Sequence, residues 1–179
     1  MGITIHHKLG LQKVYVKDAL DNAERTAEYM KMEATRLKMD FKIRRLSPYS
    51  LLIDIDGCET LGFTFKSVDE FLKDHDYLDF DERKKIEQGY QIENFPQNEK
   101  YYCYDFCKTQ FSKNIIAHKW VADLIKVVAS RCCFVEVGDE GDYYHSGKLG
   151  DAQEAIKENG LMIAGLMGTF EKMGYQTKK

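Results

Sequence analysis

The sequence has few prolines, no long hydrophobic run and no excess of charge of one sign. There are 2 prolines among 179 residues, so proline-rich linkers are excluded. The longest nearly uncharged run, residues 160–170, is far shorter than the roughly 20 residues that span a membrane. The first residues also lack the layout of a signal peptide. We therefore expect a cytoplasmic protein with no membrane association.

The balance of charges excludes a strong electrostatic preference for one class of partner. Charged residues make up 31% of the chain, but the net charge at pH 7 is −3, and Lys and Glu are interleaved. Such a surface does not favour a polyanion, so charge gives no indication of nucleic acid.

Size and cysteine usage predict one reduced domain over residues 1–179. A chain of this length with 44% hydrophobic residues can bury about 70% of the surface that its unfolded form exposes, and needs no disulfides. Five cysteines is an odd number, and Cys132 and Cys133 are adjacent, which favours free thiols. Cys103 and Cys107 lie on one face of a predicted strand and are interpreted as buried thiols rather than metal ligands.

The first half predicts a short strand at residues 3–7, a long helix over 17–38 and another strand at 41–46. One apolar stripe with helical spacing runs along the helix. It consists of Leu20, Ala23, Ala27, Met30, Ala34 and Leu37.

A β-hairpin is predicted around Gly57. Pairing Ile55 with Leu61 also pairs Ile53 with Phe63 and Leu51 with Phe65, which places all six apolar residues on one buried face. The preceding segment, with Asp54 and Asp56, resembles the first motif of haloacid dehalogenase-type phosphatases. That reaction requires a parallel sheet, whereas the pattern is antiparallel, so we expect a hairpin and no nucleophile at Asp54.

The second half predicts a strand, helix, strand unit from Tyr101 to Val137, with the helix over about residues 112–131. The last strand is apolar on both faces, which is typical of a central strand. If the two strands are parallel, the polar run 108–110 and the acidic turn 138–142 meet at one edge of the sheet.

This edge is the predicted site. Its candidate catalytic residues are Lys108, Gln110, His118, Asp139, Glu140 and Tyr144. These groups could serve acid–base chemistry or bind a hard divalent metal. The candidate metal ligands are His118, Asp139, Glu140, Glu59 and His6. The same residues could equally form an ion-pair network around a turn, with His118 as a satisfied histidine at the margin of its helix.

Three further features concern connections and the C-terminal part. Two short helices are predicted over residues 67–90, and residues 91–100 form a loop or a lid.

A last helix is expected from Asp151, an N-cap with Glu154 three residues on. Small residues repeat in this helix and predict a close contact with the helix over 17–38 or a homodimer interface. They are Gly160, Ala164 and Gly168.

Several short motifs are similar to those of an uncharacterised prokaryotic protein family. They are Thr4–His6, Gly57–Glu59, Lys108–Phe111, His118, Asp139–Gly141 and Tyr143–Tyr144. The resemblance spans nearly the whole chain and implies no activity. It favours tests of Glu59 and of the polar residues from Lys108 to Glu140. Tyr144, where many relatives are expected to have Trp, and His7, where Tyr is usual, depart from the pattern.

The predicted fold is α+β, a mostly antiparallel twisted sheet of about six strands with the long helices on one face. The order of elements is similar to a TATA-binding-protein-like or ferredoxin-like arrangement. Two functions are consistent with the sequence. The first is a small ligand-binding, protein-binding or regulatory module. The second is a metal-assisted hydrolase or transferase that uses His118, Asp139 and Glu140.

Overall fold

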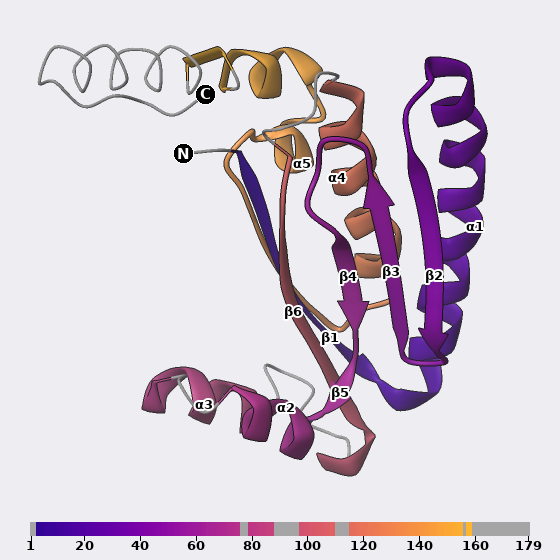
Figure 1. Ribbon diagram of the computed structural model, residues 1–179. Helices are drawn as coiled ribbons and strands as arrows, with labels where there is room; N and C mark the ends of the chain where they lie inside the picture. The colour runs from indigo at the N-terminus through magenta and orange to yellow at the C-terminus, as the bar shows by residue number, and fades with distance from the viewer. Residues whose placement is uncertain (1–2, 76–78, 88–96, 110–114, 156, 159–179) are drawn as a thin grey trace, which may run out of the picture.

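The computed structural model describes residues 3–75, 79–87, 97–109, 115–155 and 157–158 (Figure 1). Within these residues the chain has an α+β fold, as predicted, with two antiparallel sheets of four and three strands. None of the helices in this described part is both long enough and apolar enough to cross a membrane.

The four-stranded sheet contains β1 (Thr4–Gln12), β5 (Lys66–Ser67), β6 (Lys100–Lys108) and β7 (Phe134–Asp139), in the order β5-β6-β1-β7. β1 pairs antiparallel with both β6 and β7, so β6 and β7 run parallel to each other. Helix α4 (Ile115–Ala129) connects them. The predicted parallel crossover is therefore confirmed, with β1 inserted between its two strands.

The prediction that the last strand is central is wrong, because β7 lies at an edge of the sheet. Val135 is 40% exposed there. Phe134 is apolar for another reason: it packs against a second hydrophobic cluster, which includes Val68, Phe71 and Tyr102. Phe134 contacts this second cluster on one face of β7, and Val137 contacts the main core on the other. Apolar residues on both faces therefore do not require a neighbouring strand on each side of β7.

The three-stranded sheet consists of β2 (Phe41–Ser47), β3 (Ser50–Ile55) and β4 (Leu61–Thr64). The predicted hairpin forms, but its register differs by two residues, since Ile53 pairs with Leu61 and Leu51 with Phe63. The connecting loop is longer than predicted, and Ile55 pairs instead with Phe41 of β2. Strand side chains alternate with a period of two, so this shift leaves all six apolar residues buried.

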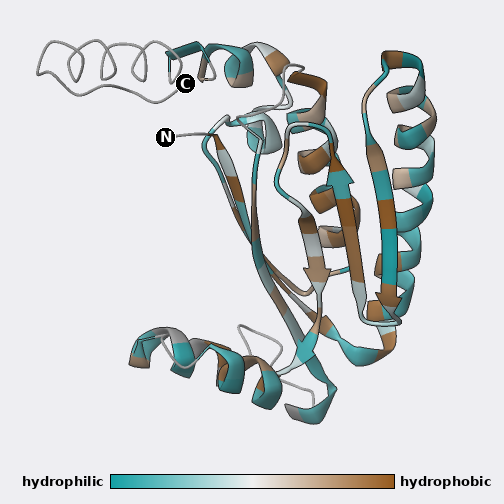
Figure 2. Ribbon diagram, viewed as in Figure 1, coloured by the Kyte–Doolittle hydropathy of each residue, from teal (hydrophilic) through white to brown (hydrophobic). Residues whose placement is uncertain are grey.

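The described strands form two hydrogen-bonded sheets rather than one sheet of about six members. β4 leads directly into β5, and this continuous segment pairs first with β3 and then with β6. Helix α1 (Lys13–Leu37) lies beside α4 on one side of the strands (Figure 1). Hydrophobic residues of β3, β4 and α4 occupy the middle of the molecule, whereas the outer side of α1 is largely hydrophilic (Figure 2).

The two short helices predicted over residues 67–90 are α2 (Val68–Asp74) and α3 (Phe80–Glu87). Ser67 and Glu70 form a capping box at the start of α2. Residues 91–96 of the predicted loop or lid lie outside the described residues, and its last part is a 3₁₀ helix (Gln97–Glu99) followed by the start of β6 at Lys100.

The C-terminal helix begins earlier than predicted. A short helix α5 (Tyr143–Ser146) comes first, and the next helical run begins at Leu149. The N–H of Asp151 donates to the carbonyl of Lys148 at 3.2 Å, so Asp151 lies inside the first turn and is not the N-cap. The repeated small residues at 160, 164 and 168 lie outside the described residues.

Candidate functional site

The predicted site lies where β6 and β7 end beside the first turn of α4. Nδ1 of His118 is 2.7 Å from Oγ1 of Thr109, and its Nε2 is 3.2 Å from Oδ1 of Asp139. The side chains of His118 and Asp139 have 0% exposure, and Thr109 is fully buried. The expectation that His118 is a boundary residue at the margin of its helix is therefore wrong, because its imidazole is enclosed by the polar ends of both strands.

Asp139 holds the acidic turn closed. Its Oδ1 accepts from the N–H of Gly141 at 2.8 Å, and its Oδ2 accepts from the N–H of Tyr144 at 2.7 Å. Burial opposes ionisation of this carboxyl, but the contact with His118 and the two N–H donors outweigh it and lower its pKa. Nε2 of His118 lies at ion-pair distance from Asp139 without good hydrogen-bond geometry. Most of the acceptor capacity of Asp139 is therefore used within the fold.

Lys108 does not join this cluster. It pairs with Thr4 of β1, whereas Asp139 pairs with Ile5, and neighbouring residues of a strand point to opposite faces. Nζ of Lys108 lies 3.8 Å from the Glu59 carboxylate instead. Thr109, one residue further on, has the orientation that reaches His118.

The side chains of the remaining described candidates make other contacts. Glu140 accepts from the N–H of Thr4 at 2.8 Å. The ring of Tyr144 lies beside the ammonium of Lys126, and His6 lies next to Phe106 on the other face of the sheet. Gln110 lies outside the described residues. Among the residues that the structure describes, no three His, Cys, Asp or Glu side chains are grouped so that they could hold a metal ion.

Asp54 is part of the antiparallel hairpin, as expected. It accepts from Arg44 at 3.0 Å and from Thr60 at 2.6 Å, on a strand that pairs antiparallel on both sides. The parallel strand that the phosphatase motif requires is not present at this position.

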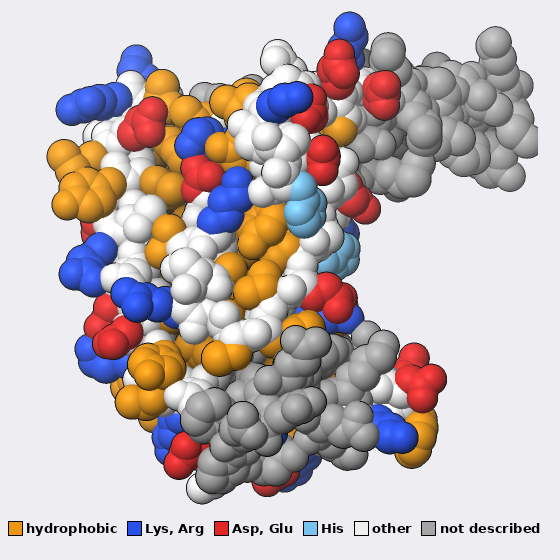
Figure 3. Space-filling model, turned by 180° about the vertical axis from the view of Figure 1, so that it is seen from behind, with side chains coloured by type: hydrophobic (Ala, Val, Ile, Leu, Met, Phe, Trp, Pro, Cys, Tyr) orange, Lys and Arg blue, Asp and Glu red, His pale blue; other side chains and the backbone are white. Residues whose placement is uncertain are grey.

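A second site, which the sequence did not predict, is an open cleft of about 620 Å³ between α1 and α4. Figure 3 shows the side of the molecule that carries these two helices. The cleft is lined by Asn22, Arg25, Thr26, Tyr29, Lys126, Val127, Ser130 and Arg131. Among these described residues of the lining, three side chains are cationic and none is a carboxylate.

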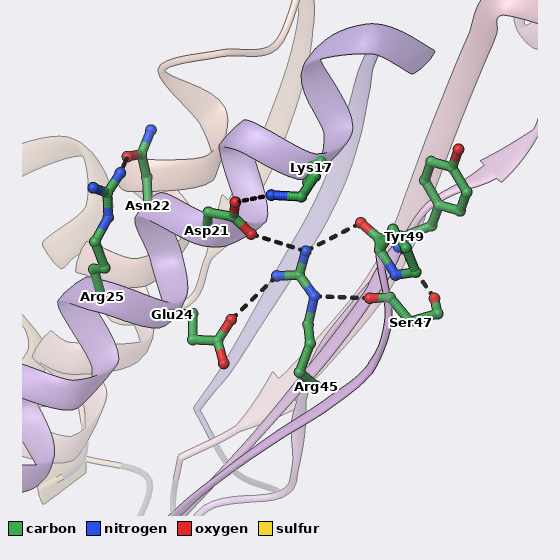
Figure 4. A network of polar contacts seen from close by, with 9 residues as sticks. Lys17, Asp21, Asn22, Glu24, Arg25, Arg45, Ser47 and Tyr49 are labelled. Carbon is green, nitrogen blue, oxygen red and sulfur yellow. Dashed lines mark hydrogen bonds and ion pairs between the residues drawn. The ribbon is translucent and has the colours of Figure 1, made fainter.

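The nearby carboxylates of α1 are neutralised on another side of the helix. Asp21 and Glu24 lie 3.2 Å and 3.5 Å from the Arg45 guanidinium, which also donates to the carbonyls of Ser47 and Pro48 (Figure 4). The hydrogen bond from Lys17, reinforced by the charge of Arg45, lowers the pKa of Asp21. These two carboxylates are therefore paired with Arg45, although the charge of Arg25 also acts on Asp21.

Two of the three cations of the cleft make their close contacts with neutral groups. Arg25 donates to the Asn22 side chain at 2.5 Å, on the side of α1 away from Arg45 (Figure 4). The ammonium of Lys126 lies 4.8 Å from the ring centroid of Tyr143 and 5.3 Å from that of Tyr144. Both contacts position a cation without cancelling its charge.

The sequence carried only a weak signal for this cleft. Asn22, Arg25, Thr26 and Tyr29 follow helical spacing and form one polar stripe of α1. By itself, the stripe predicts a solvent-exposed face of α1. Only the packing of α4 beside α1 makes it one wall of a cleft.

Comparison with models of protein families, with curated proteins and with solved structures finds no match for this chain. The resemblance to an uncharacterised prokaryotic family stays a prediction from the sequence.

Proposed function

We propose that this protein is a small binding module that takes an anionic ligand, bearing a phosphate or carboxylate group, in the cleft between α1 and α4. The observation that carries the proposal is the convergence of Arg25, Lys126 and Arg131 on one cleft, with no carboxylate among the residues described in its lining. Guanidinium groups bind oxyanions through paired N–H donors, which favours this class of ligand.

The size and the edges of the cleft support a small ligand. Its volume of about 620 Å³ falls within the range of small-molecule sites. Tyr29, which is 75% exposed, offers an aromatic surface for the uncharged part of a ligand. Asn22, Thr26 and Ser130 add neutral polar groups that could orient it.

Compensation of the helix dipole is a competing explanation for two of the three cations. Lys126 and Arg131 lie in the last turn of α4 and just after it, where the dipole favours positive charge. Arg25, however, lies within α1, far from either end. The dipole of α4 therefore does not explain the third cation.

The alternative, a metal-assisted hydrolase or transferase, has less support. It requires His118 and Asp139 to meet a substrate or a metal, but both side chains are buried. Asp139 also accepts two backbone hydrogen bonds that a ligand would have to replace.

Titration with inorganic phosphate and phenyl phosphate tests the proposal, with ionic strength held constant by chloride. We expect saturable binding and a rise in the melting temperature, because a ligand that binds only the folded state stabilises it. Arg25→Gln and Arg131→Gln should each weaken binding roughly tenfold, the effect of losing one charge-assisted hydrogen bond.

Arg36→Gln is the matched control, since Arg36 is an exposed arginine of the same helix that does not line the cleft. If Arg36→Gln weakens binding as much as Arg25→Gln, or if chloride alone stabilises equally, then the cleft is not an anion site.

A further inference from the structure

The outer face of the four-stranded sheet carries a regular arrangement of side chains that neither site uses. The inner face, with Ile5, Leu9 and Cys107, belongs to the main core. Register places the alternate residues on the opposite face in rows across β6, β1 and β7. One row is Phe106, His6 and Gly138, and the next is Tyr104, Lys8 and Glu136.

The first of these rows forms an exposed aromatic shelf. Phe106 is 43% exposed, and the ring of the exposed His6 lies 5.7 Å from it, centroid to centroid. Gly138 continues the row without a side chain, and a Cβ built there meets no atom of the described residues within 4 Å. Two aromatic rings and one bare position are thus adjacent on a single open surface.

The lower part of the same face is closed by α2. Phe71 and Tyr102 belong to the second hydrophobic cluster, and their rings are 6.2 Å apart. His75 stacks on Phe71 at 4.0 Å and lies 6.3 Å from Tyr104. This packing limits the open aromatic surface to the row of Phe106, His6 and Gly138.

Lysines border the shelf on both sides. Nζ of Lys108 lies 5.9 Å from the Phe106 centroid, and Nζ of Lys8 lies 5.7 Å from the Tyr104 centroid. Lys8 is held by Glu136 at 3.0 Å. The contact of Lys108 with Glu59 is longer, at 3.8 Å, and both side chains are about two-fifths exposed, so Lys108 can turn toward a ligand anion at little cost.

We propose that the shelf of Phe106, His6 and Gly138 binds one planar heteroaromatic ring by stacking, with an anionic group of the same ligand against Lys108. Three adjacent strands span only about 10 Å, which suits one ring system. Nucleoside monophosphates combine such a ring with such an anion. Stacking on an aromatic side chain is tolerant of the identity of the base, so no particular base is assigned.

This shelf is independent of the anion cleft. The cleft is built from α1 and α4, which pack against the inner face of the sheet, whereas the shelf lies on its outer face. Variants of one site leave the other intact, so the two proposals can fail separately.

Titrations of ¹⁵N-labelled protein followed by NMR test the shelf with three probes. Adenosine monophosphate carries the ring and the anion, adenosine carries the ring, and ribose 5-phosphate carries only the anion. We expect the monophosphate and adenosine to shift the amides around His6, Phe106 and Gly138. Ribose 5-phosphate should leave these amides unchanged, even if it shifts those of the cleft.

Two variants separate the contributions of the ring and the anion. Phe106→Ala should weaken binding of adenosine and of its monophosphate by roughly tenfold each. Lys108→Gln should weaken binding of the monophosphate and leave adenosine unaffected. Phe80→Ala is the matched control, because Phe80 is 76% exposed on α3 and lies outside the shelf.

Three results would overturn the proposal. In the first, neither adenosine nor its monophosphate shifts the amides of the shelf. In the second, ribose 5-phosphate shifts them as strongly as the monophosphate, so that only an anion is bound. In the third, a thymidine oligonucleotide, titrated as a fourth probe, binds far more tightly than adenosine monophosphate and shifts amides beyond the row, which would replace the single-ring site by one for single-stranded nucleic acid.

Discussion

The hydroxyl of Thr109 lies 2.7 Å from Nδ1 of His118, and this contact joins the end of β6 to the first turn of α4. On its other side His118 faces Asp139, a carboxylate that can only accept. Thr109, His118 and Asp139 therefore form one line of buried polar contacts, and the Thr109 hydroxyl also donates to the Ile3 carbonyl at 3.4 Å. This buried chain of three residues ties both strand ends to the helix that connects them.

His118→Ala should destabilise the fold by about 2–4 kcal/mol. The substitution removes a buried ring and leaves Thr109 and Asp139 without their shared partner. Urea unfolding measures the change in the free energy of unfolding. His6→Ala, at an exposed position of β1, should change it by no more than about 0.5 kcal/mol. Equal losses in the two variants would show that His118 is not part of a buried network.

Gly141→Ala should destabilise the acidic turn by about 1–3 kcal/mol. A Cβ at position 141 would lie 2.7 Å from Nε2 of His118, a ring that is packed in place. Gly138→Ala is the matched control, because the space around its Cβ is open. Thermal unfolding of both variants checks the contrast, and a Gly141→Ala protein as stable as the control would mean that the turn can relax.

His7 should make stability fall as the pH decreases below about 6.5. Burial lowers the pKa of His7 from 6.5 to about 4, although a hydrogen bond with the Gly62 carbonyl partly opposes this. Between these values the unfolded state binds a proton that the folded state does not, so acidification favours unfolding.

The size of this effect can be isolated with His7→Gln. From about pH 7.5 to pH 5 the wild-type protein should lose about 2 kcal/mol more stability than the variant. Parallel pH profiles of the two proteins, measured by urea unfolding, would contradict the assignment of a buried neutral imidazole.

The cysteines should differ sharply in their reaction with an alkylating reagent. Cys133 is exposed, whereas Cys103 and Cys107 are buried. Burial raises the pKa of Cys103 and raises that of Cys132 to about 12, which depletes the reactive thiolate. Mass spectrometry of the native protein should find Cys133 modified first, with Cys103 and Cys107 modified only after unfolding. A disulfide between any of them would contradict this.

In the hairpin, periodicity alone determined which residues face the core. Its register was predicted two residues away from the observed one, and all six apolar residues were still placed on the buried face. A strand repeats every two residues, so parity, and not exact pairing, decides burial. The same local reasoning predicted the parallel crossover from β6 through α4 to β7, because consecutive elements with a helix between them pack in few ways.

Only the tertiary structure decided which polar residues meet. The sequence predicted that the ends of β6 and β7 lie at one edge of the sheet. The pairing of both strands with β1 decided which of their side chains point to the same face of the sheet, and so Thr109 rather than Lys108 contacts His118. Arg25 and Arg131 line one cleft because α1 and α4 pack side by side, and no local pattern encodes that contact. The aromatic row likewise depends on register across three strands that are distant in sequence. Local periodicity therefore set the buried face of the hairpin strands, whereas pairing between distant elements decided which polar side chains meet.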